Sequence, residues 1–277
     1  MLTRSSPLAQ AARYLALGLG AVVMLAPFAY MLSTSFKPHA YVLELPPRLI
    51  PRDATLDNYV NALTSNHFGR YFLNSAIVAT ASTAVSVVLA AMLAYAFARW
   101  DFPGRNVLFY GMLGTLMVPS LTLIIPQFVL AKNLHLLNSR QGLVVVYSAG
   151  IAFGVFLLRG FFEELPQDLL DAAVVDGAGP FRTFWDIALP LARPALAAVA
   201  IFSFLYAWDE FTWALTAISD ERLYTLPIAI RSFQRQHGTE WGLVFAATTI
   251  AVLPTITVFV LFQRHFIKGV TSGAIKG

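Results

Sequence analysis

The sequence predicts an all-α integral membrane protein with six transmembrane helices. Of its 277 residues, 57% are hydrophobic and 12% are charged, and the mean hydropathy is +0.65. So few charges cannot cover a soluble surface of this size. Six apolar stretches approach the length of about 20 residues that a helix needs to cross the hydrocarbon. Backbone groups in lipid must be satisfied internally, and the stretches exceed the about 10 residues of a membrane strand, so helices are expected.

The expected spans form one transmembrane domain that covers residues 1–277. They are residues 12–32, 71–98, 106–130, 141–158, 194–218 and 241–263. The first is longer than a typical signal-peptide core and lacks a clear small-residue cleavage site, which favours a retained span. Four prolines inside spans are expected to kink or interrupt them, namely Pro27, Pro119, Pro126 and Pro254.

Charge and motif content argue against nucleic-acid binding and catalysis. The net charge is +4, but the 19 Lys and Arg residues are scattered, so anionic membrane lipid explains the excess better than nucleic acid. There is no cysteine, and therefore no thiolate metal site. No phosphate-binding G-x-x-x-x-G-K-[ST] loop occurs, and the five histidines are remote from one another. No catalytic residue and no metal ligand is predicted.

Residues 163–193, between the fourth and fifth spans, predict two short helices joined by a bend. Residues 167–175 are helix formers, with Asp168 as a helix-start residue. Gly177 stands where a helix end favours positive φ. A second helix is expected over residues 181–187 and is expected to end at Leu189-Pro190. A side chain at position 177 is expected to stand between the two helices.

The spacing of Asp171-Ala172-Ala173, Gly177, Ile187 and Leu189-Pro190 resembles the loop signature of bacterial ABC importer membrane subunits. That pattern begins with Glu, whereas Asp171 keeps the charge on a side chain one methylene shorter. The resemblance implies a cytoplasmic coupling-helix loop that sits in a groove of an ATPase subunit. The implied ATPase-coupling residues are Asp171, Ala172, Ala173, Gly177, Phe181, Phe184, Trp185, Ile187, Leu189 and Pro190.

The fifth span contains the acidic pair Asp209-Glu210. A carboxylate at the centre of a membrane helix costs about 2.5–3.5 kcal/mol on insertion scales, so a functional role is the first interpretation. The alternative is that the pair lies near the outer end of the span and only packs against a neighbour. The segment resembles the Trp-Asn-Glu-Phe pattern of the carbohydrate branch of these permeases, with Asp209 replacing Asn. The implied substrate-path residues are Tyr206, Trp208, Asp209, Glu210, Phe211 and Trp213.

Two further segments resemble the carbohydrate-uptake permeases related to the smaller membrane subunit of the maltose importer. Residues 224–230 resemble the entrance to the loop that reaches toward the binding protein. The polar residues 231–240 are long enough to project to that protein, although a plain solvated connector is the alternative. The implied binding-protein contacts are Arg231, Phe233, Gln234 and Arg235. Residues 269–277 resemble the tail that contacts the ATPase, although a disordered end is the alternative. The implied tail contacts are Thr271, Ser272, Gly273 and Lys276.

Together these resemblances imply a permease subunit of an ATP-driven, binding-protein-dependent importer that forms half of the pathway for a sugar or related polyol compound. Its expected partners are a sister permease, an ATPase dimer, an extracytoplasmic solute-binding protein and membrane lipid. ATP and Mg would bind the ATPase, with no cofactor on this chain. The coupling loop, rather than the even distribution of Lys and Arg, places both termini in the cytoplasm of a bacterial inner membrane.

Two other classes of protein remain open from the sequence. A proton-coupled secondary carrier would use Asp209 or Glu210 as a proton relay. A membrane-embedded enzyme would use the same residues as acid and base. Neither class explains the coupling loop and the tail together.

Overall fold

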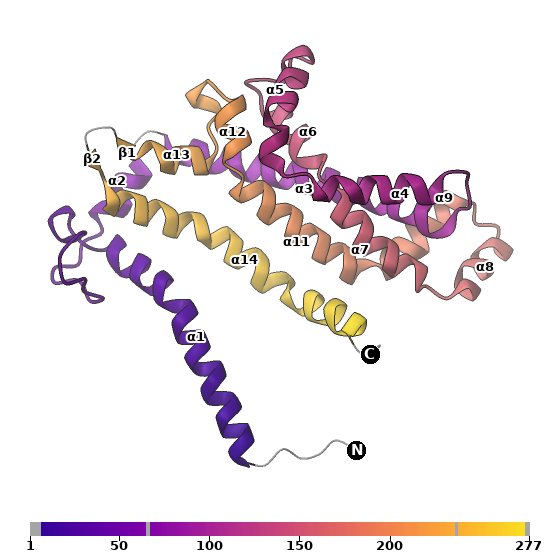
Figure 1. Ribbon diagram of the computed structural model, residues 1–277, viewed down its shortest axis with the longest axis horizontal. Helices are drawn as coiled ribbons and strands as arrows, with labels where there is room; N and C mark the ends of the chain where they lie inside the picture. The colour runs from indigo at the N-terminus through magenta and orange to yellow at the C-terminus, as the bar shows by residue number, and fades with distance from the viewer. Residues whose placement is uncertain (1–6, 65–66, 236–237, 275–277) are drawn as a thin grey trace. The chain divides into compact units, whose positions relative to one another are not determined.

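The computed structural model describes residues 7–64, 67–235 and 238–274 (Figure 1). This part of the chain is nearly all-helical, which confirms the predicted fold class. Its strands are the two-residue β1 (Gln234–Arg235) and β2 (Gly238–Thr239), paired as an antiparallel hairpin. The chain forms two compact units, one of Met1–Phe68 with Ala229–Leu253 and one of Gly69–Ile228 with Pro254–Gly277.

The first unit contains α1 (Pro7–Ser35), η1 (His39–Tyr41), α2 (Asp57–Thr64), the hairpin and the start of α14 (Trp241–Ala274). Lys37 is buried here, and its Nζ donates to the Arg48 carbonyl at 2.7 Å. The Asn58 side chain donates to the carbonyls of Ser35 and Lys37. These bonds fasten the segment after α1, and one of them satisfies the carbonyl of Ser35, the last residue of that helix.

The second unit holds most of the remaining helices. They are α3 (Phe68–Arg99), α4 (Arg105–Gly114), η2 (Thr115–Met117), η3 (Ser120–Leu123), α5 (Ile124–Asn133), α6 (Arg140–Ser148), α7 (Ala152–Glu163), α8 (Gln167–Val175), α9 (Pro180–Thr183), the π-helical η4 (Phe184–Ala188), α10 (Leu189–Leu191), α11 (Arg193–Asp209), α12 (Thr212–Ala217), η5 (Glu221–Leu223) and α13 (Leu226–Ser232), which ends in the first unit.

Small residues let α3, α7 and α11 approach closely in the core of this unit. A Cβ added at Gly154 of α7 would lie 2.9 Å from Val199 Cγ1 of α11 and 3.1 Å from Ala90 Cβ of α3. Around this point, Leu158 and Phe162 of α7 are fully buried. In lipid, where apolar burial between helices is not a driving force, such close packing stabilises the bundle.

Within the described residues, three helices are long and apolar enough to cross a membrane, judged by length and composition. They are Leu8–Ser35, Phe68–Arg99 and Trp241–Phe262. Three bent pairs raise the number to as many as six if each pair is one span. The pairs are Arg105–Met117 with Ser120–Asn133 at 99°, Arg140–Ser148 with Ala152–Glu163 at 46°, and Pro180–Leu191 with Arg193–Asp209 at 79°.

The break in residues 106–130 falls at Pro119, where an interruption is expected, whereas the breaks in residues 141–158 and 194–218 correct the expectation of continuous helices. Val118 has extended backbone because it precedes Pro119, which disfavours the helical conformation of its neighbour. The stretch over residues 194–218 breaks at Glu210, whose backbone is also extended. Pro27 and Pro254, in contrast, lie inside α1 and α14, which continue through them.

Candidate functional site

The segment from α8 to α10 follows the end of α7 (Figure 1). Helix α8 covers Gln167–Val175, the range expected from the sequence. Its N-cap is Pro166, which makes no side-chain cap, and Asp168 lies in the first turn. The expectation that Asp168 starts the helix is therefore wrong, although its charge still faces the positive end of the helix dipole.

Gly177 ends α8 with positive φ, as predicted. Its φ is 79°, its N–H donates to the Val174 carbonyl at 3.0 Å, and the Ala178 N–H donates to the Ala173 carbonyl at 2.9 Å. These two bonds form a Schellman motif, which satisfies carbonyls at a helix end. An added Cβ would meet no atom within 4 Å. The expectation that a side chain here would stand between the two helices is therefore wrong, and the cost of substitution lies in the backbone.

The second helical stretch continues past Leu189-Pro190 to Leu191, contrary to expectation. In the π-helical η4, the Leu189 N–H bonds the Phe184 carbonyl five residues back. This wider turn accommodates a proline, which lacks an N–H and would clash with a carbonyl in a regular α-helix.

The predicted coupling residues divide into exposed and buried groups. Asp171, Ala172 and Gly177 are exposed, and Phe181 and Trp185 are 68% and 48% exposed. Other large apolar side chains of α8 are also exposed, namely Leu169, Val174 and Val175. So many exposed apolar side chains on a short loop indicate a surface that a partner covers.

Phe184 and Ala173 are buried within this chain. The Phe184 ring lies 5.1 Å from that of Tyr95 on α3 and 6.5 Å from that of Phe162 on α7, measured between centroids. The other members, Ile187, Leu189 and Pro190, are half-buried. A sequence signal existed, because Phe184, Ala188, Ala192, Ala195 and Val199 recur every three or four residues and are all buried.

A second candidate site is a pocket of about 220 Å³ between α3, the α6–α7 pair and α11. Its lining residues are Ser86, Ala90, Tyr147, Gly150, Ile151, Phe153, Gly154, Val199, Phe202, Ser203 and Tyr206. Aromatic rings and the hydroxyl-bearing side chains of Ser and Tyr therefore meet here. Tyr206 is the predicted substrate-path residue that lines this pocket.

The tryptophans of the predicted substrate path are buried elsewhere. Trp208 and Trp213 are 3% and 4% exposed. The Trp208 ring stacks on Phe204 at 5.6 Å and meets the edge of Phe72 at 5.5 Å. Neither ring lines the pocket at Tyr206. The reason is packing, since large aromatic side chains inside a bundle contribute most through the contacts that they bury.

Glu210 joins two helices. Its carboxylate accepts hydrogen bonds from the Trp213 N–H at 2.8 Å, the Ala214 N–H at 3.1 Å and the Tyr147 hydroxyl at 2.8 Å. The two backbone N–H groups lie at the start of α12, where such groups lack helical partners, and the hydroxyl comes from α6. Asp209, at the end of α11, is exposed, and Phe211 is half-buried at the break. The packing interpretation thus accounts for Glu210.

The segment expected to reach a binding protein is the compact hairpin of the first unit. Arg231 Nη1 donates to the Gln234 carbonyl at 3.2 Å, and Gln234 and Arg235 form β1. Phe233 is 4% exposed, so the outward-facing candidates in this segment are its polar residues.

The tail residues Thr271, Ser272 and Gly273 continue α14, whereas Lys276 lies outside the described residues. Across the described part of the chain, no three His, Asp or Glu side chains are placed to hold a metal ion.

Comparison with known proteins identifies similar chains. Residues 86–272 match the family model of the binding-protein-dependent transport system inner membrane component. Diacetylchitobiose uptake system permease protein NgcG of Streptomyces coelicolor is 38% identical, over 93% of this chain and 86% of that protein. Trehalose/maltose transport system permease protein MalG of Thermococcus litoralis is 36% identical over 93% of each chain.

Trehalose transport system permease protein SugB of Mycobacterium tuberculosis is 35% identical, over 91% of this chain and 93% of that protein. In structure, the chain is similar to a chain of a bacterial ABC transporter involved in the import of the acidic polysaccharide alginate. The TM-score is 0.83 at 24% identity, over 96% of this chain and 99% of that one. This likeness establishes a shared fold.

Proposed function

The chain belongs to the family of binding-protein-dependent transport system inner membrane components, and from this premise we propose that it forms half of the pathway of an ATP-driven sugar importer. The observation that carries the proposal is the exposed apolar surface of the loop at Gly177, on a chain whose sequence matches saccharide permeases. A sister permease supplies the other half, and an extracytoplasmic binding protein delivers the substrate.

ATP is hydrolysed on a separate pair of ATPase subunits. This chain has no phosphate-binding loop sequence, which supports the assignment of ATP and Mg to the partner. Phe181 and Trp185 enter a groove of the ATPase, where their burial stabilises the complex. Closure of the ATPase dimer then moves the loop, and the spans follow as rigid bodies that alternate the access of the pathway.

The pocket at Tyr206 is the part of this chain that contacts the sugar. Rings such as Phe153 and Phe202 stack on the apolar faces of a sugar ring, while the hydroxyls of Ser86 and Ser203 bond sugar hydroxyls. Its volume of about 220 Å³ is below the about 300–1,000 Å³ of sites that enclose a whole ligand. A sister subunit therefore completes the site.

The assignment of the loop to the ATPase also sets the orientation of the chain in the membrane. The coupling loop faces the cytoplasm because the ATPase is there, and six spans then return both termini to the cytoplasmic side of the inner membrane. The tail at Thr271 to Gly273, which ends α14, lies on the ATPase side in this arrangement.

The test is uptake by proteoliposomes that contain this chain, its sister permease and the ATPase, with binding protein outside. Uptake of a labelled disaccharide is expected to require ATP and binding protein and to continue when an uncoupler collapses the proton gradient. Uptake that needs the gradient and proceeds without the ATPase would establish the proton-coupled carrier instead.

A further inference from the structure

Arg99, the last residue of α3, joins three helices at the base of the coupling loop. Its Nη2 donates to the carbonyls of Phe162 and Leu165, both at 2.5 Å, and its Nη1 donates to Gln167 Oε1 at 3.0 Å. Phe162 lies in the last turn of α7, and Gln167 is the first residue of α8. One half-buried guanidinium therefore holds the ends of α3, α7 and α8 together.

The link extends from Arg99 into the coupling motif. Gln167 Nε2 donates to Asp171 Oδ1 at 2.9 Å, one turn further along α8. Gln167 therefore accepts from Arg99 with its oxygen and donates to Asp171 with its nitrogen. Polar groups arranged in series polarise one another and hold a fixed geometry. The carboxylate of Asp171 is thereby connected to α3 through two hydrogen bonds.

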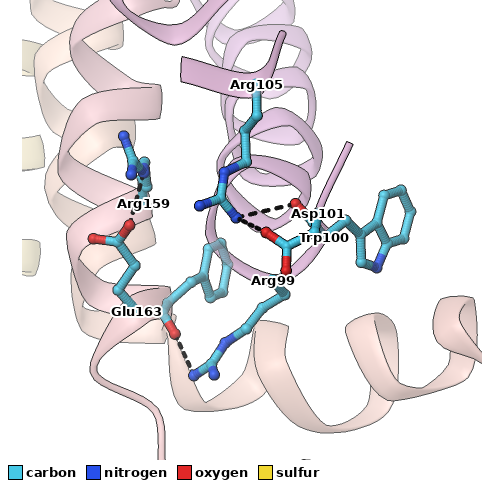
Figure 2. A network of polar contacts seen from close by, with 7 residues as sticks. Arg99, Trp100, Asp101, Arg105, Arg159 and Glu163 are labelled. Atoms are coloured by element: carbon cyan, nitrogen blue, oxygen red, sulfur yellow. Dashed lines mark hydrogen bonds and ion pairs between the residues drawn. The ribbon is translucent and has the colours of Figure 1, made fainter. Parts of the chain in front are cut away.

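Neighbouring arginines have a different kind of partner. Arg105 pairs with Asp101 at 2.7 Å, and Arg159 pairs with Glu163 at 2.8 Å, each four residues away. Figure 2 shows these two pairs beside Arg99. Each ion pair stays within its own segment, although the Arg159 guanidinium also lies 4.0 Å from the centroid of the Phe109 ring. The hydrogen bonds of Arg99, in contrast, reach residues 63, 66 and 68 positions away.

We propose that Arg99 is a positioning residue that fixes α8 against the ends of α3 and α7, so that a displacement of the coupling loop moves these spans with it. The consequence, coupling of ATP hydrolysis to transport, rests on the proposed function. The planar guanidinium offers five donors in a fixed fork, which suits two carbonyls and an amide oxygen at once. A lysine ammonium keeps the charge but cannot reproduce this geometry.

The first experiment compares Arg99→Lys with Arg105→Lys in the complete reconstituted transporter. Arg99→Lys is expected to lower the amount of substrate transported per ATP hydrolysed by about fivefold or more, the lower end of measured couplings between sites. The amount of ATPase that copurifies is expected to stay unchanged. Arg105→Lys, which changes the first residue of α4 and removes no bond to α8, is expected to leave the ratio unchanged.

A second measurement reads the position of α8 directly. The chain has no cysteine, so Val175→Cys at the exposed end of α8 gives a single site for a spin label in the full-length protein. The label is expected to be more mobile when Arg99→Lys is added and unchanged when Arg105→Lys is added. This result does not depend on transport, so it distinguishes failure of the inference from failure of the proposed function.

Gln167→Met provides the milder variant if Arg99→Lys does not assemble. It breaks the link at the next residue and leaves the arginine bonds to α7 in place. In a double-mutant cycle, the two substitutions are expected to be non-additive because they interrupt the same link. Additive effects, or an Arg99→Lys variant that matches Arg105→Lys in both ratio and label mobility, would overturn the proposal.

Discussion

At the scale of single residues, Gly177 is the position where the backbone constrains the choice of side chain. Its φ is 79°, while Gly179, two residues later, has φ −72° and ψ 168°. Neither glycine would crowd a neighbour with an added Cβ. The two positions therefore separate the effect of backbone conformation from the effect of side-chain size.

We expect Gly177→Val to release the ATPase and Gly179→Val to retain it. A left-handed conformation costs a residue with a Cβ about 1–2 kcal/mol, and more when the side chain is β-branched. Gly177→Asn is expected to be milder, since Asn tolerates this conformation. Copurification of the ATPase with the membrane subunits measures the effect. Equal retention by the two valine variants would show that the bend does not control docking.

Tyr206 and Trp208 lie two residues apart on α11 but in different surroundings. Tyr206 lines the pocket and is 52% exposed, whereas Trp208 is 3% exposed. Trp208→Ala is expected to lose about 3–5 kcal/mol of stability by leaving a cavity. Tyr206→Ala is expected to lower uptake at a normal amount of folded protein. Size-exclusion chromatography of solubilised membranes measures the amount of folded protein, and uptake is then expressed per folded transporter. The two measurements separate a loss of stability from a loss of transport. Normal folding of Trp208→Ala would contradict its burial.

At the scale of elements, α12 depends on Glu210 for its start. Loss of a charged acceptor leaves buried N–H donors unsatisfied, at a cost of about 1–3 kcal/mol. We therefore expect Glu210→Ala to speed hydrogen exchange at the Trp213 and Ala214 amides. Asp209→Asn, at the exposed neighbouring position, is the control and should leave exchange unchanged. Identical exchange in both variants would rule out the capping role.

The second helical stretch of the coupling loop carries aromatic residues with opposite environments. Phe181 and Trp185 are exposed, whereas Phe184 is 5% exposed. Phe181→Ala or Trp185→Ala is expected to weaken ATPase docking by about 2 kcal/mol, as at a binding hot spot. Phe184→Ala is expected to reduce the amount of folded protein. The amount of folded subunit measures the effect at Phe184. ATPase retention per folded subunit measures the effect at Phe181 and Trp185. Loss of docking in Phe184→Ala, with normal docking in Phe181→Ala and Trp185→Ala, would mean that the loop docks through the face that carries Phe184.

At the scale of the whole molecule, local patterns in the sequence determine the class of protein and the position of the coupling loop. Hydropathy and length predict membrane helices because each helix satisfies its own backbone. The turn at Gly177 was predictable because its positive φ depends on the residues of that turn alone. Charges, however, could not indicate orientation, and hydropathy could not show the break in residues 194–218.

Only the tertiary structure decided which side chains face partners and which hold the fold. Phe181 and Phe184 have the same chemistry, and burial of Phe184 requires Tyr95 and Phe162, which come from two earlier helices. Likewise, Glu210 caps a helix with the help of Tyr147, and Arg99 reaches Gln167 across 68 residues. Such contacts form when distant segments pack, so their energies depend on a three-dimensional arrangement that no local pattern specifies.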